Sequence, residues 1–355
     1  MRVYYDYQIM LAQKFGGISR YVYEVSKRLP SLGADVGMRA VYNRNYYFSR
    51  RFGLKDSSSL SKLAAFHLIN KAARFFDLHQ GKYDIFHPTY YYADKFSGSK
   101  LIVTVHDMTH ELYSLNPRVI SAKRKIIPQA DRIIAVSENT KRDILKFFPA
   151  LDPEIISVIY HGASMSMINI NVNEAEAVLP YDYILFVGLR SLYKNFSRFT
   201  EAAKSLMSRS RELHVLCVGG GSFTDEEISS FGEFSGRFHQ LSLSDDELAR
   251  SYNGARCFVF PSEYEGFGIP LLEAFACSCP VVCSNSSSLP EIAGSAAEYF
   301  DPLSVDDMAG KIQKVIEDDE LRGNLINAGH ERLKFFDWDK AAFETLKCYS
   351  IALKG

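Results

Sequence analysis

The chain has 355 residues, of which 47% are hydrophobic, 23% charged and 13% aromatic, so it has the composition of folded soluble protein, which excludes a fibre, a disordered tail or a disulfide mini-protein. One hydrophobic core stops growing at roughly 250 to 300 residues, so we expect two domains with a ligand-binding cleft between them. The formal net charge of −1 gives no indication of nucleic-acid binding.

Short apolar runs bounded by Gly, Pro or Asp alternate with segments of helical period, which is typical of a parallel sheet covered by helices. In the first half, the expected strands are residues 2–5, 36–41, 85–87, 101–105, 132–136 and 155–159. Helices are expected over 19–29 and 137–148, the second with Ser137 as its N-cap. Residues 61–76 form a basic, amphipathic segment that either lies on a membrane or packs on its own domain.

The second half repeats this plan, so the sequence predicts two α/β domains. Its expected strands are residues 183–187, 213–218, 238–241, 257–261, 281–284 and 297–300. Its expected helices are residues 195–208, 244–252, 270–276, 288–293 and 304–317. Residues 163–182 are weakly patterned, and we expect them to be the linker between the domains.

The near-neutral total conceals two halves of opposite charge. Residues 1–165 contain 24 Lys and Arg against 14 Asp and Glu, a net charge of +10, and the remainder has a net charge of −11. The basic half suits an anionic membrane or a diphosphate, although two solvated surfaces that merely differ explain it equally well. The sequence shows no stretch of about 20 apolar residues and no signal-peptide core, so we expect a cytoplasmic protein that does not span a membrane.

All six cysteines lie in the second half, mostly in apolar runs, where cysteine acts as a small core residue. Cys277, Cys279 and Cys283 are close in sequence but lack the paired spacing of a zinc site. The cysteines therefore fit a reducing cytoplasm.

A pair of glycines, Gly16 and Gly17, lies between the first strand and a helix. Glycine amides and a helix N-terminus can approach an anion closely, although a tight turn explains the pair as well. The spacing differs from the Gly-x-Gly-x-x-Gly dinucleotide fingerprint, which argues against a nicotinamide enzyme.

His106 and Asp107 follow the apolar strand 101–105, so we expect them at the carboxyl edge of the sheet, facing the cleft. There His106 can donate a hydrogen bond to a substrate, and Asp107 can orient it. The alternatives are a surface histidine near a turn and a metal cluster with His110 and Glu111.

Gly188 ends a strand of the second half, and Arg190 and Lys194 follow it four residues apart. The two cations can converge on one anion, Arg190 as a planar fork and Lys194 as a point charge. A diphosphate leaving group needs such neutralisation where the sequence shows no acidic metal-binding motif. A solvated basic helix start is the alternative.

The most specific motif is a glycine loop that follows the strand ending at Pro261 and precedes a helix near Pro270. Backbone amides suited to a phosphate or to sugar hydroxyls are those of Gly266, Phe267, Gly268 and Ile269. Glu265 and Glu273 lie on either side of these amides, so they can hold opposite ends of one ligand, such as a hexose and a ribose. Their separation argues against a role in which the two carboxylates act together as general acid and base.

Together these motifs resemble the retaining glycosyltransferases of family 4, which have the GT-B fold of two Rossmann-like β/α/β domains facing across a cleft. The chain is similar to the bacterial mannosyltransferase-like members that build O-antigen and other surface polysaccharides. The resemblance covers nearly the whole chain and rests on the GGI loop, TVHDMTHE, AVSENTKRDI, VIYHG, VG-x-R-x3-KN, FPSEYEGFGIPLLEA, SSLPE and the terminal helix that begins at Asp337-Trp338.

The resemblance implies an acceptor-binding domain over residues 1–170, completed by a crossing helix at about 338–355, and a donor-binding domain over residues 171–337. It implies that Gly16 and Gly17 contact the donor diphosphate or the acceptor, with Asp107 on the acceptor side, and that His106 hydrogen-bonds the transferred sugar. The implied donor-binding residues of the second domain are Gly188, Arg190 and Lys194 for the diphosphate, Glu265 for the sugar, the amides from Gly266 to Ile269 for sugar and phosphate, and Glu273 for the ribose.

The implied reaction is a front-face displacement with retention, in which the departing phosphate oxygen takes the acceptor proton. The resemblance implies no metal and no other cofactor. It implies a nucleotide-sugar donor, GDP-mannose, and a saccharide acceptor on a polyprenyl diphosphate at the inner face of the cytoplasmic membrane, with no nucleic-acid partner. A UDP-sugar donor, a catalytically silent sugar-nucleotide-binding scaffold and a non-transferring epimerase remain the alternatives.

Overall fold

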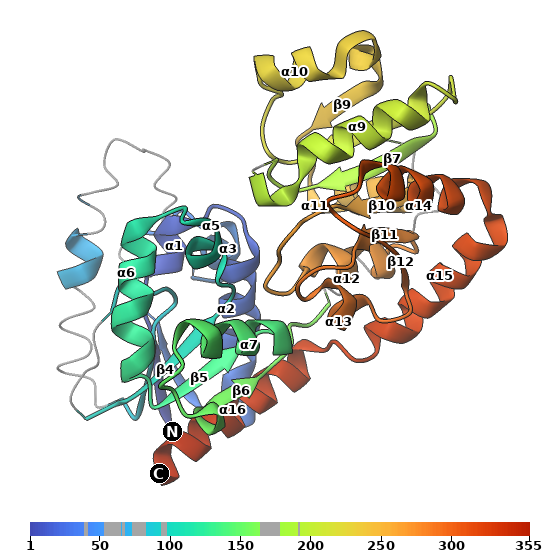
Figure 1. The fold of residues 1–355 in the computed structure, drawn as a ribbon. Coiled ribbons are helices and arrows are strands. Elements are labelled where there is room, and N and C mark those ends of the chain that lie inside the picture. The colour runs from blue at the N-terminus through green and yellow to red at the C-terminus, as the bar shows by residue number, and fades with distance from the viewer. Residues whose placement is uncertain are drawn as a thin grey trace. The chain divides into compact units, whose positions relative to one another are not determined.

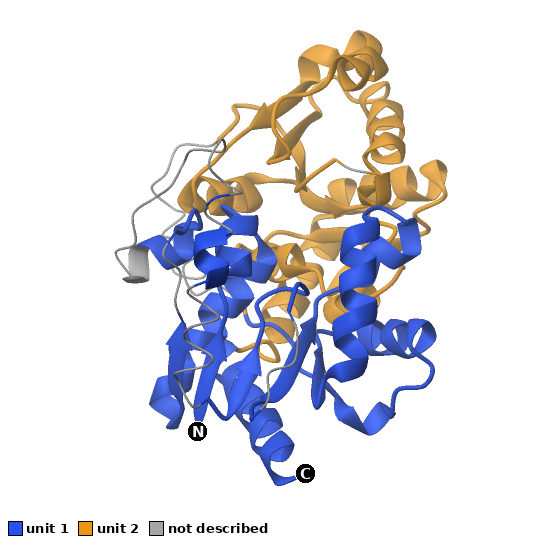
Figure 2. Ribbon diagram, turned by 90° about the vertical axis from the view of Figure 1, so that its left-hand side faces the viewer, with its two compact units in different colours: residues 1–162, 338–355 blue, residues 163–337 orange. Residues whose placement is uncertain are grey.

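The computed structural model describes residues 1–38, 42–52, 65, 68–72, 83–93, 98–163, 178–190 and 192–355. The chain divides into two compact units, Met1–Gly162 with Trp338–Gly355, and Ala163–Asp337 (Figure 2). The expected boundary after residue 170 lies outside the described residues. The same holds for the end of the strand expected at 36–41 and for most of the expected linker and of the amphipathic segment 61–76.

The first unit contains a parallel sheet in the order β2-β1-β3-β4-β5-β6, of which β4, β5 and β6 are labelled in Figure 1. Its strands are β1 (Arg2–Tyr5), β2 (Asp35–Met38), β3 (Ile85–His87), β4 (Lys100–Val105), β5 (Arg132–Ala135) and β6 (Ile156–Val158). Its helices are α1 (Gln8–Ala12), α2 (Gly17–Arg28), α3 (Tyr46–Phe52), α5 (Thr109–Tyr113), α6 (Pro117–Ile126), α7 (Glu138–Phe147) and α16 (Trp338–Lys354). The Ser137 hydroxyl accepts a hydrogen bond from the Thr140 N–H at 3.0 Å, so the predicted N-cap of α7 is confirmed.

Helices cover both faces of this sheet. One core cluster packs residues of α2, such as Tyr21 and Val25, with Ile102 of β4 and with Trp338 and Tyr349 of α16. A second cluster packs the other sheet face against α6 and α7. Because both faces are buried, the strands are continuous apolar runs, which is why the sequence pattern located them. The C-terminal helix belongs to this first unit and contacts α2.

The second unit contains a parallel sheet in the order β12-β11-β10-β7-β8-β9. Its strands are β7 (Tyr183–Val187), β8 (His214–Val218), β9 (Phe238–Leu241), β10 (Cys257–Phe260), β11 (Val281–Ser284) and β12 (Ala297–Phe300). Its helices are α9 (Phe196–Met207), α10 (Asp225–Phe231), α11 (Asp245–Gly254), α12 (Ile269–Ala276), α13 (Leu289–Ala293), α14 (Val305–Glu317) and α15 (Asp319–Leu333). Two parallel sheets with helices confirm the predicted fold class.

In each sheet the strand order reverses at the first strand of the unit, because later strands lie on both sides of it. β1 lies between β2 and β3, and β7 lies between β8 and β10. Ligands of open parallel sheets bind outside the carboxyl ends of the strands at such a reversal. The residues that follow β1 and β3, and those that follow β7 and β10, are therefore the places in each unit where a site is expected.

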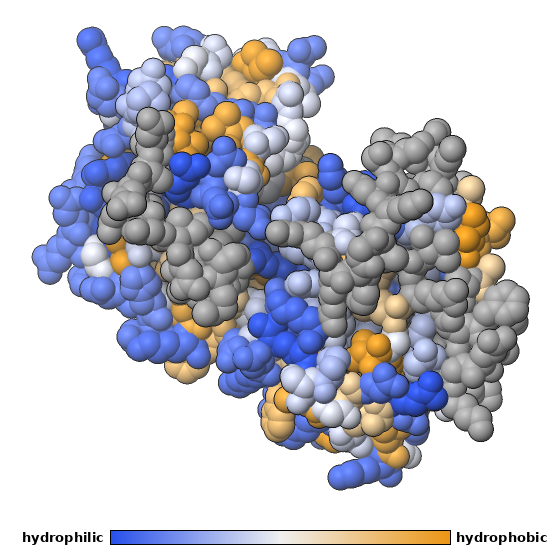
Figure 3. Space-filling view, turned by 180° about the vertical axis from the view of Figure 1, so that it is seen from behind, coloured by the Kyte–Doolittle hydropathy of each residue, from blue (hydrophilic) through white to orange (hydrophobic). Residues whose placement is uncertain are grey.

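No helix in the described part of the chain is long and apolar enough to cross a bilayer. Figure 3 shows one face of the molecule, on which the coloured apolar residues lie in separate spots among polar ones. All six cysteines are buried and free, as expected for small core residues.

Candidate functional site

In the second unit, hydrogen bonds join the loops that follow β7 and β10. The Glu263 N–H donates to the Tyr193 carbonyl at 2.8 Å, and the Asn195 side chain donates to the carbonyls of Pro261 at 3.1 Å and Pro302 at 2.7 Å. Asn195 has a left-handed backbone with φ of 58°, a conformation that asparagine tolerates better than most residues. These bonds fix the short segment before α9 that carries Lys194.

Lys194 and Glu265 meet at this reversal point of the second sheet. The Lys194 Nζ lies 2.6 Å from Glu265 Oε1, and the two side chains are only 18% and 13% exposed. The ammonium also lies over the rings of Tyr193 and Phe260, at 5.3 and 5.7 Å from their centroids. The structure thus brings one predicted anion-binding residue into contact with one predicted sugar-binding residue.

The glycine loop after β10 is held by two serines of the neighbouring loop. The Glu265 N–H donates to the Ser287 hydroxyl at 2.9 Å, and the Ser288 hydroxyl donates to the carbonyls of Glu265 and Phe267 at 2.9 and 3.0 Å. Gly268 has φ of +103°, and a Cβ there would lie 3.0 Å from Leu289 Cδ2, so only glycine fits. The loop leads directly into α12, which begins at Ile269.

Glu273 lies in α12 and is 9% exposed. Its Oε2 accepts a hydrogen bond from the Tyr252 hydroxyl of α11 at 3.3 Å. Burial first, and then the neighbouring Glu273 carboxylate, raise the pKa of Tyr252 well above its usual value, so the hydroxyl keeps its proton. Tyr252 therefore orients the carboxylate to which the sequence assigned a ribose.

Arg190 and Lys194 contact different carboxylates. Arg190 Nε lies 2.6 Å from Glu227 Oε1 at the start of α10, and the rest of the guanidinium faces the loop after β8. This differs from the expectation that Arg190 and Lys194 converge on one anion. Gly188, which precedes them, has φ of +128°, so the chain turns out of β7 in a conformation that favours glycine.

In the first unit, Gly16 is the N-cap of α2, and Gly17 is its first residue. A Cβ on Gly16 would lie 2.4 Å from the side-chain oxygen of Gln13, which accepts a hydrogen bond from the Ser19 N–H. Glycine at position 16 thus leaves room for the Gln13 side chain, which would have to shift if residue 16 carried a Cβ.

His106 follows β4 and is half-buried. The backbone N–H of His106 donates to the Tyr91 hydroxyl at 3.3 Å, and the imidazole ring packs edge-on against Tyr21 at a centroid distance of 5.1 Å. Burial, followed by the charges of His87 and Lys123, lowers the pKa of His106 to about 3. The imidazole is therefore neutral at physiological pH and can both donate and accept a hydrogen bond.

Asp107 precedes the short helix α5 and faces a buried lysine that sequence reasoning missed. Its Oδ1 accepts from the Thr109 N–H at 3.0 Å and lies 3.7 Å from Lys123 Nζ. Lys123 is fully buried and lies 3.0 Å from Glu111 Oε2. Among the described residues, no three His, Cys, Asp or Glu side chains are placed to hold a metal ion, so the alternative of a metal cluster here gains no support.

A chain of buried hydrogen bonds supports Tyr21, and it too was missed by sequence reasoning. The Tyr349 hydroxyl of α16 bonds His87 Nδ1 at 2.6 Å, His87 Nε2 bonds the Thr104 hydroxyl at 2.8 Å, and this hydroxyl bonds Tyr21 at 3.1 Å. Tyr21 in turn contacts the His106 ring. The C-terminal helix thus supports the end of β4.

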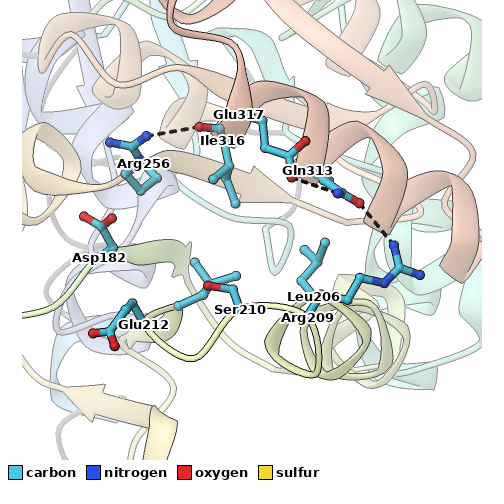
Figure 4. Close-up of a pocket in the computed structure, with 10 residues that line it drawn as sticks. Asp182, Leu206, Arg209, Ser210, Glu212, Arg256, Gln313, Ile316 and Glu317 are labelled. Carbon is cyan, nitrogen blue, oxygen red and sulfur yellow. Dashed lines mark hydrogen bonds between the residues drawn. The ribbon is translucent and has the colours of Figure 1, made fainter.

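A cavity of about 120 Å³ lies elsewhere in the second unit, at the amino ends of the strands (Figure 4). It is lined by residues that precede β7, β8 and β10, such as Asp182, Glu212 and Arg256. The predicted donor-binding residues follow β7 and β10 at the opposite, carboxyl edge, so this cavity is separate from the candidate site.

The two parallel sheets with their covering helices form a two-domain α/β fold of the GT-B class, and solved structures show the same fold. Sucrose-phosphate synthase from Thermosynechococcus elongatus superposes with a TM-score of 0.74, at 18% identity and 98% coverage of both chains. WaaG, a glycosyltransferase involved in lipopolysaccharide biosynthesis, superposes with a TM-score of 0.70, at 16% identity and 100% coverage of both chains.

Family models identify the chain more closely. Residues 15–166 match the model described as Glycosyltransferase Family 4, and residues 170–332 match the model described as Glycosyl transferases group 1. The chain belongs to the family 4 glycosyltransferases, and it is an enzyme of the hexosyltransferase type.

Curated relatives carry related names. O-antigen chain mannosyltransferase B of Escherichia coli is 28% identical over 307 residues, covering 81% of this chain and 80% of that protein. Serotype-specific mannosyltransferase WbdA of Escherichia coli is 25% identical over 240 residues, which is 64% of this chain and only 29% of that protein. A Campylobacter jejuni relative, 29% identical over 62% of this chain and 60% of its own length, is named as a 4-alpha-N-acetylgalactosaminyltransferase acting on a sugar-diphospho-undecaprenol.

Proposed function

We propose that the protein transfers mannose from GDP-mannose, with retention of configuration, to a lipid-linked saccharide during synthesis of an O-antigen or a similar surface polysaccharide. The Lys194–Glu265 pair carries this proposal, because it sets a cation for a phosphate beside a carboxylate for sugar hydroxyls at the reversal point of the second sheet. The names of the mannosyltransferase relatives support mannose as the sugar.

Each residue of the second unit has a separate task in this proposal. Lys194 stabilises the diphosphate as negative charge develops on it, which is where a preorganised cation accelerates reaction. Glu265 binds hydroxyls of the transferred sugar, and Glu273, oriented by Tyr252, binds the ribose. Amides of the loop Gly266–Ile269 bind sugar and phosphate at the start of α12.

In the first unit, His106 donates or accepts a hydrogen bond at the transferred sugar as a neutral imidazole. The bond between the sugar C1 and the phosphate oxygen breaks, and a bond from the acceptor oxygen to C1 forms on the same face. The acceptor proton passes to the departing phosphate oxygen, so GDP and the extended acceptor are the products. No metal ion is required by this scheme, because Lys194 and the helix N-terminus supply the positive potential.

The acceptor is a saccharide on a polyprenyl diphosphate, and the first unit offers features that suit it. A hollow of about 500 Å³ is lined by Tyr91, Tyr92, Arg118 and Lys125. Aromatic faces suit sugar rings, and the cations suit a diphosphate. The name of the Campylobacter jejuni relative, which includes a diphospho-undecaprenol substrate, supports this class of acceptor. The basic first half would contact the inner leaflet peripherally, so the protein would work in the cytoplasm.

A donor screen by thermal shift tests the proposal. GDP-mannose, GDP, UDP-glucose and UDP are compared at equal concentration, because ligand binding raises apparent stability with the logarithm of concentration over Kd. GDP-mannose is expected to give the largest shift. A larger shift with UDP-glucose would favour the alternative of a UDP-sugar transferase, and binding without turnover would favour a silent scaffold subunit.

A further inference from the structure

Arg190 is attached at the end of β7, yet its guanidinium reaches the loop that follows β8. Its Nη1 donates to the Gly219 carbonyl at 3.1 Å, and its Nη2 donates to the carbonyls of Gly221 at 3.0 Å and Ser222 at 2.9 Å. The Gly220 carbonyl lies 3.5 Å from Nη2. Four successive carbonyls therefore face one cation.

Within the second unit, a carboxylate also pairs with the positive charge of the guanidinium, and two aromatic rings lie near it. Nε donates to Glu227 Oε1 at 2.6 Å, which balances the positive charge, and the side chain is 4% exposed. The rings of Phe223 and Phe196 lie 4.9 and 5.6 Å from the guanidinium carbon. To bind a diphosphate, Arg190 would have to leave this carboxylate and these carbonyls, each of which would then lose a charged partner.

The loop has the backbone that this contact needs. Gly219, Gly220 and Gly221 all have left-handed φ angles, of +87°, +74° and +75°, which glycine adopts without strain. A Cβ on Gly220 would lie 2.7 Å from Arg190 Nη1 and 3.0 Å from the Gly188 carbonyl oxygen. The guanidinium occupies the space that a side chain would take, so the glycines and Arg190 fit as one unit.

The orientation of the carbonyls also sets that of the amides. In a trans peptide, the C=O of one residue and the N–H of the next point in opposite directions. Because the carbonyls of residues 219–222 face Arg190, the N–H groups of residues 220–223 point away from it, and residues 220–222 are exposed. This loop lies at the carboxyl end of β8, the strand next to β7, on the ligand-binding edge of the sheet.

We propose that Arg190 is a positioning residue that fixes the loop 219–222, whose outward N–H groups bind the nucleoside part of the donor. Arg190 acts through this loop and does not contact the diphosphate, for which Lys194 is the cation. This inference rests on the proposed function, since it assumes a nucleotide-sugar donor.

Titration calorimetry with GDP and GMP, repeated with UDP and UMP, separates this role from direct diphosphate binding. Arg190→Gln and Glu227→Gln should each lower the affinity for the nucleoside diphosphate and for the monophosphate by the same factor, about 10-fold. The double variant should show no further loss of affinity. KM for the nucleotide-sugar should rise while kcat changes little. If Arg190 bound the diphosphate directly, Glu227→Gln would free it and tighten GDP binding, which would overturn the proposal. A loss confined to GDP, or no loss, would overturn it as well.

Arg237 supplies a matched control at the opposite, amino edge of the same sheet. Its guanidinium donates to the carbonyls of Met207 at 2.9 Å and Ser210 at 2.7 Å and lies 4.9 Å from the Phe234 ring centroid. Arg237→Gln should therefore reduce stability without changing nucleotide affinity.

Hydrogen exchange gives a readout that needs no nucleotide. Arg190→Gln should accelerate exchange of the amides of residues 220–223, and unchanged exchange would overturn the positioning role by itself. If the wild-type protein binds none of the four nucleotides, the proposed function fails and the nucleoside assignment fails with it. If the wild type binds and the variants bind equally well, only the inference about Arg190 fails.

Discussion

Replacing Lys194 by alanine tests the assignment of the leaving-group cation. The Lys194 Nζ lies 2.6 Å from Glu265 Oε1 in a largely buried pair, so the substitution removes a preorganised charge rather than a solvated one. A charged group that acts on the developing negative charge contributes about 100-fold or more to kcat, which corresponds to about 2.7 kcal/mol. A hydrogen bond to the ground-state diphosphate contributes less, so the Kd for GDP should rise by about 10-fold at most.

The assay is GDP release under saturating donor and acceptor, with the Kd for GDP measured by calorimetry. Lys204→Ala is the matched control, because Lys204 lies in the neighbouring helix α9 and pairs with the exposed Glu201. Lys194→Ala also leaves the Glu265 carboxylate without its cation, so the melting temperature must show that the variant is folded at the assay temperature. A kcat near that of the wild type, or equal losses in kcat and in GDP affinity, would refute the reasoning.

The remaining predictions concern the other half of this pair and the buried network of the first unit. Glu265→Gln should weaken GDP-mannose but leave GDP binding equal or tighter, because Lys194 loses its competing carboxylate; calorimetry that finds equal losses for both ligands would contradict the division of tasks. Tyr349→Phe should lower the free energy of unfolding in urea by about 1 to 3 kcal/mol, because His87 Nδ1 loses its buried partner, and an unchanged urea midpoint would count against the network. The pKa of His87 is lowered to about 3 by burial, and that of His161 is also lowered, so below about pH 6.5 the unfolded chain takes up protons that the folded chain does not. Stability should therefore fall as the pH is lowered from about 7 to about 5, and a urea midpoint that stays level or rises over this range would show that these histidines are not held neutral.

The sequence predicted the strands well because both faces of each parallel sheet are buried. Such strands are short apolar runs, and each expected strand is present near its expected bounds as far as the described residues extend, the end of the strand expected at 36–41 lying outside them. Helices α10 and α15 of the second unit were not predicted, and in α15 the interior glycines Gly323 and Gly329 disfavour a helix. Gly329 has a packing reason: a Cβ there would lie 2.8 Å from the Phe275 ring of α12, so only the tertiary structure explains it.

The site residues also divide into those that the sequence could locate and those that only the structure reveals. The loops that follow β7 and β10 could be located from the glycines and prolines around them, and with them Lys194 and Glu265. The partners of Arg190 could not be foreseen, because they are backbone carbonyls set by three left-handed glycines distant in sequence. Lys123 was missed for a related reason: a lysine in a basic helix is usually solvated, and only the fold places it between Asp107 and Glu111.

The central claim is that the protein transfers mannose from GDP-mannose to a lipid-linked saccharide. Mass spectrometry of polyprenyl-diphosphate-linked saccharides, after incubation of the purified protein with GDP-mannose, tests it most directly. The account predicts an acceptor one hexose larger, formed together with GDP and lost in Lys194→Ala. An acceptor pool left unchanged with GDP-mannose, but extended when UDP-glucose is supplied, would contradict the claim.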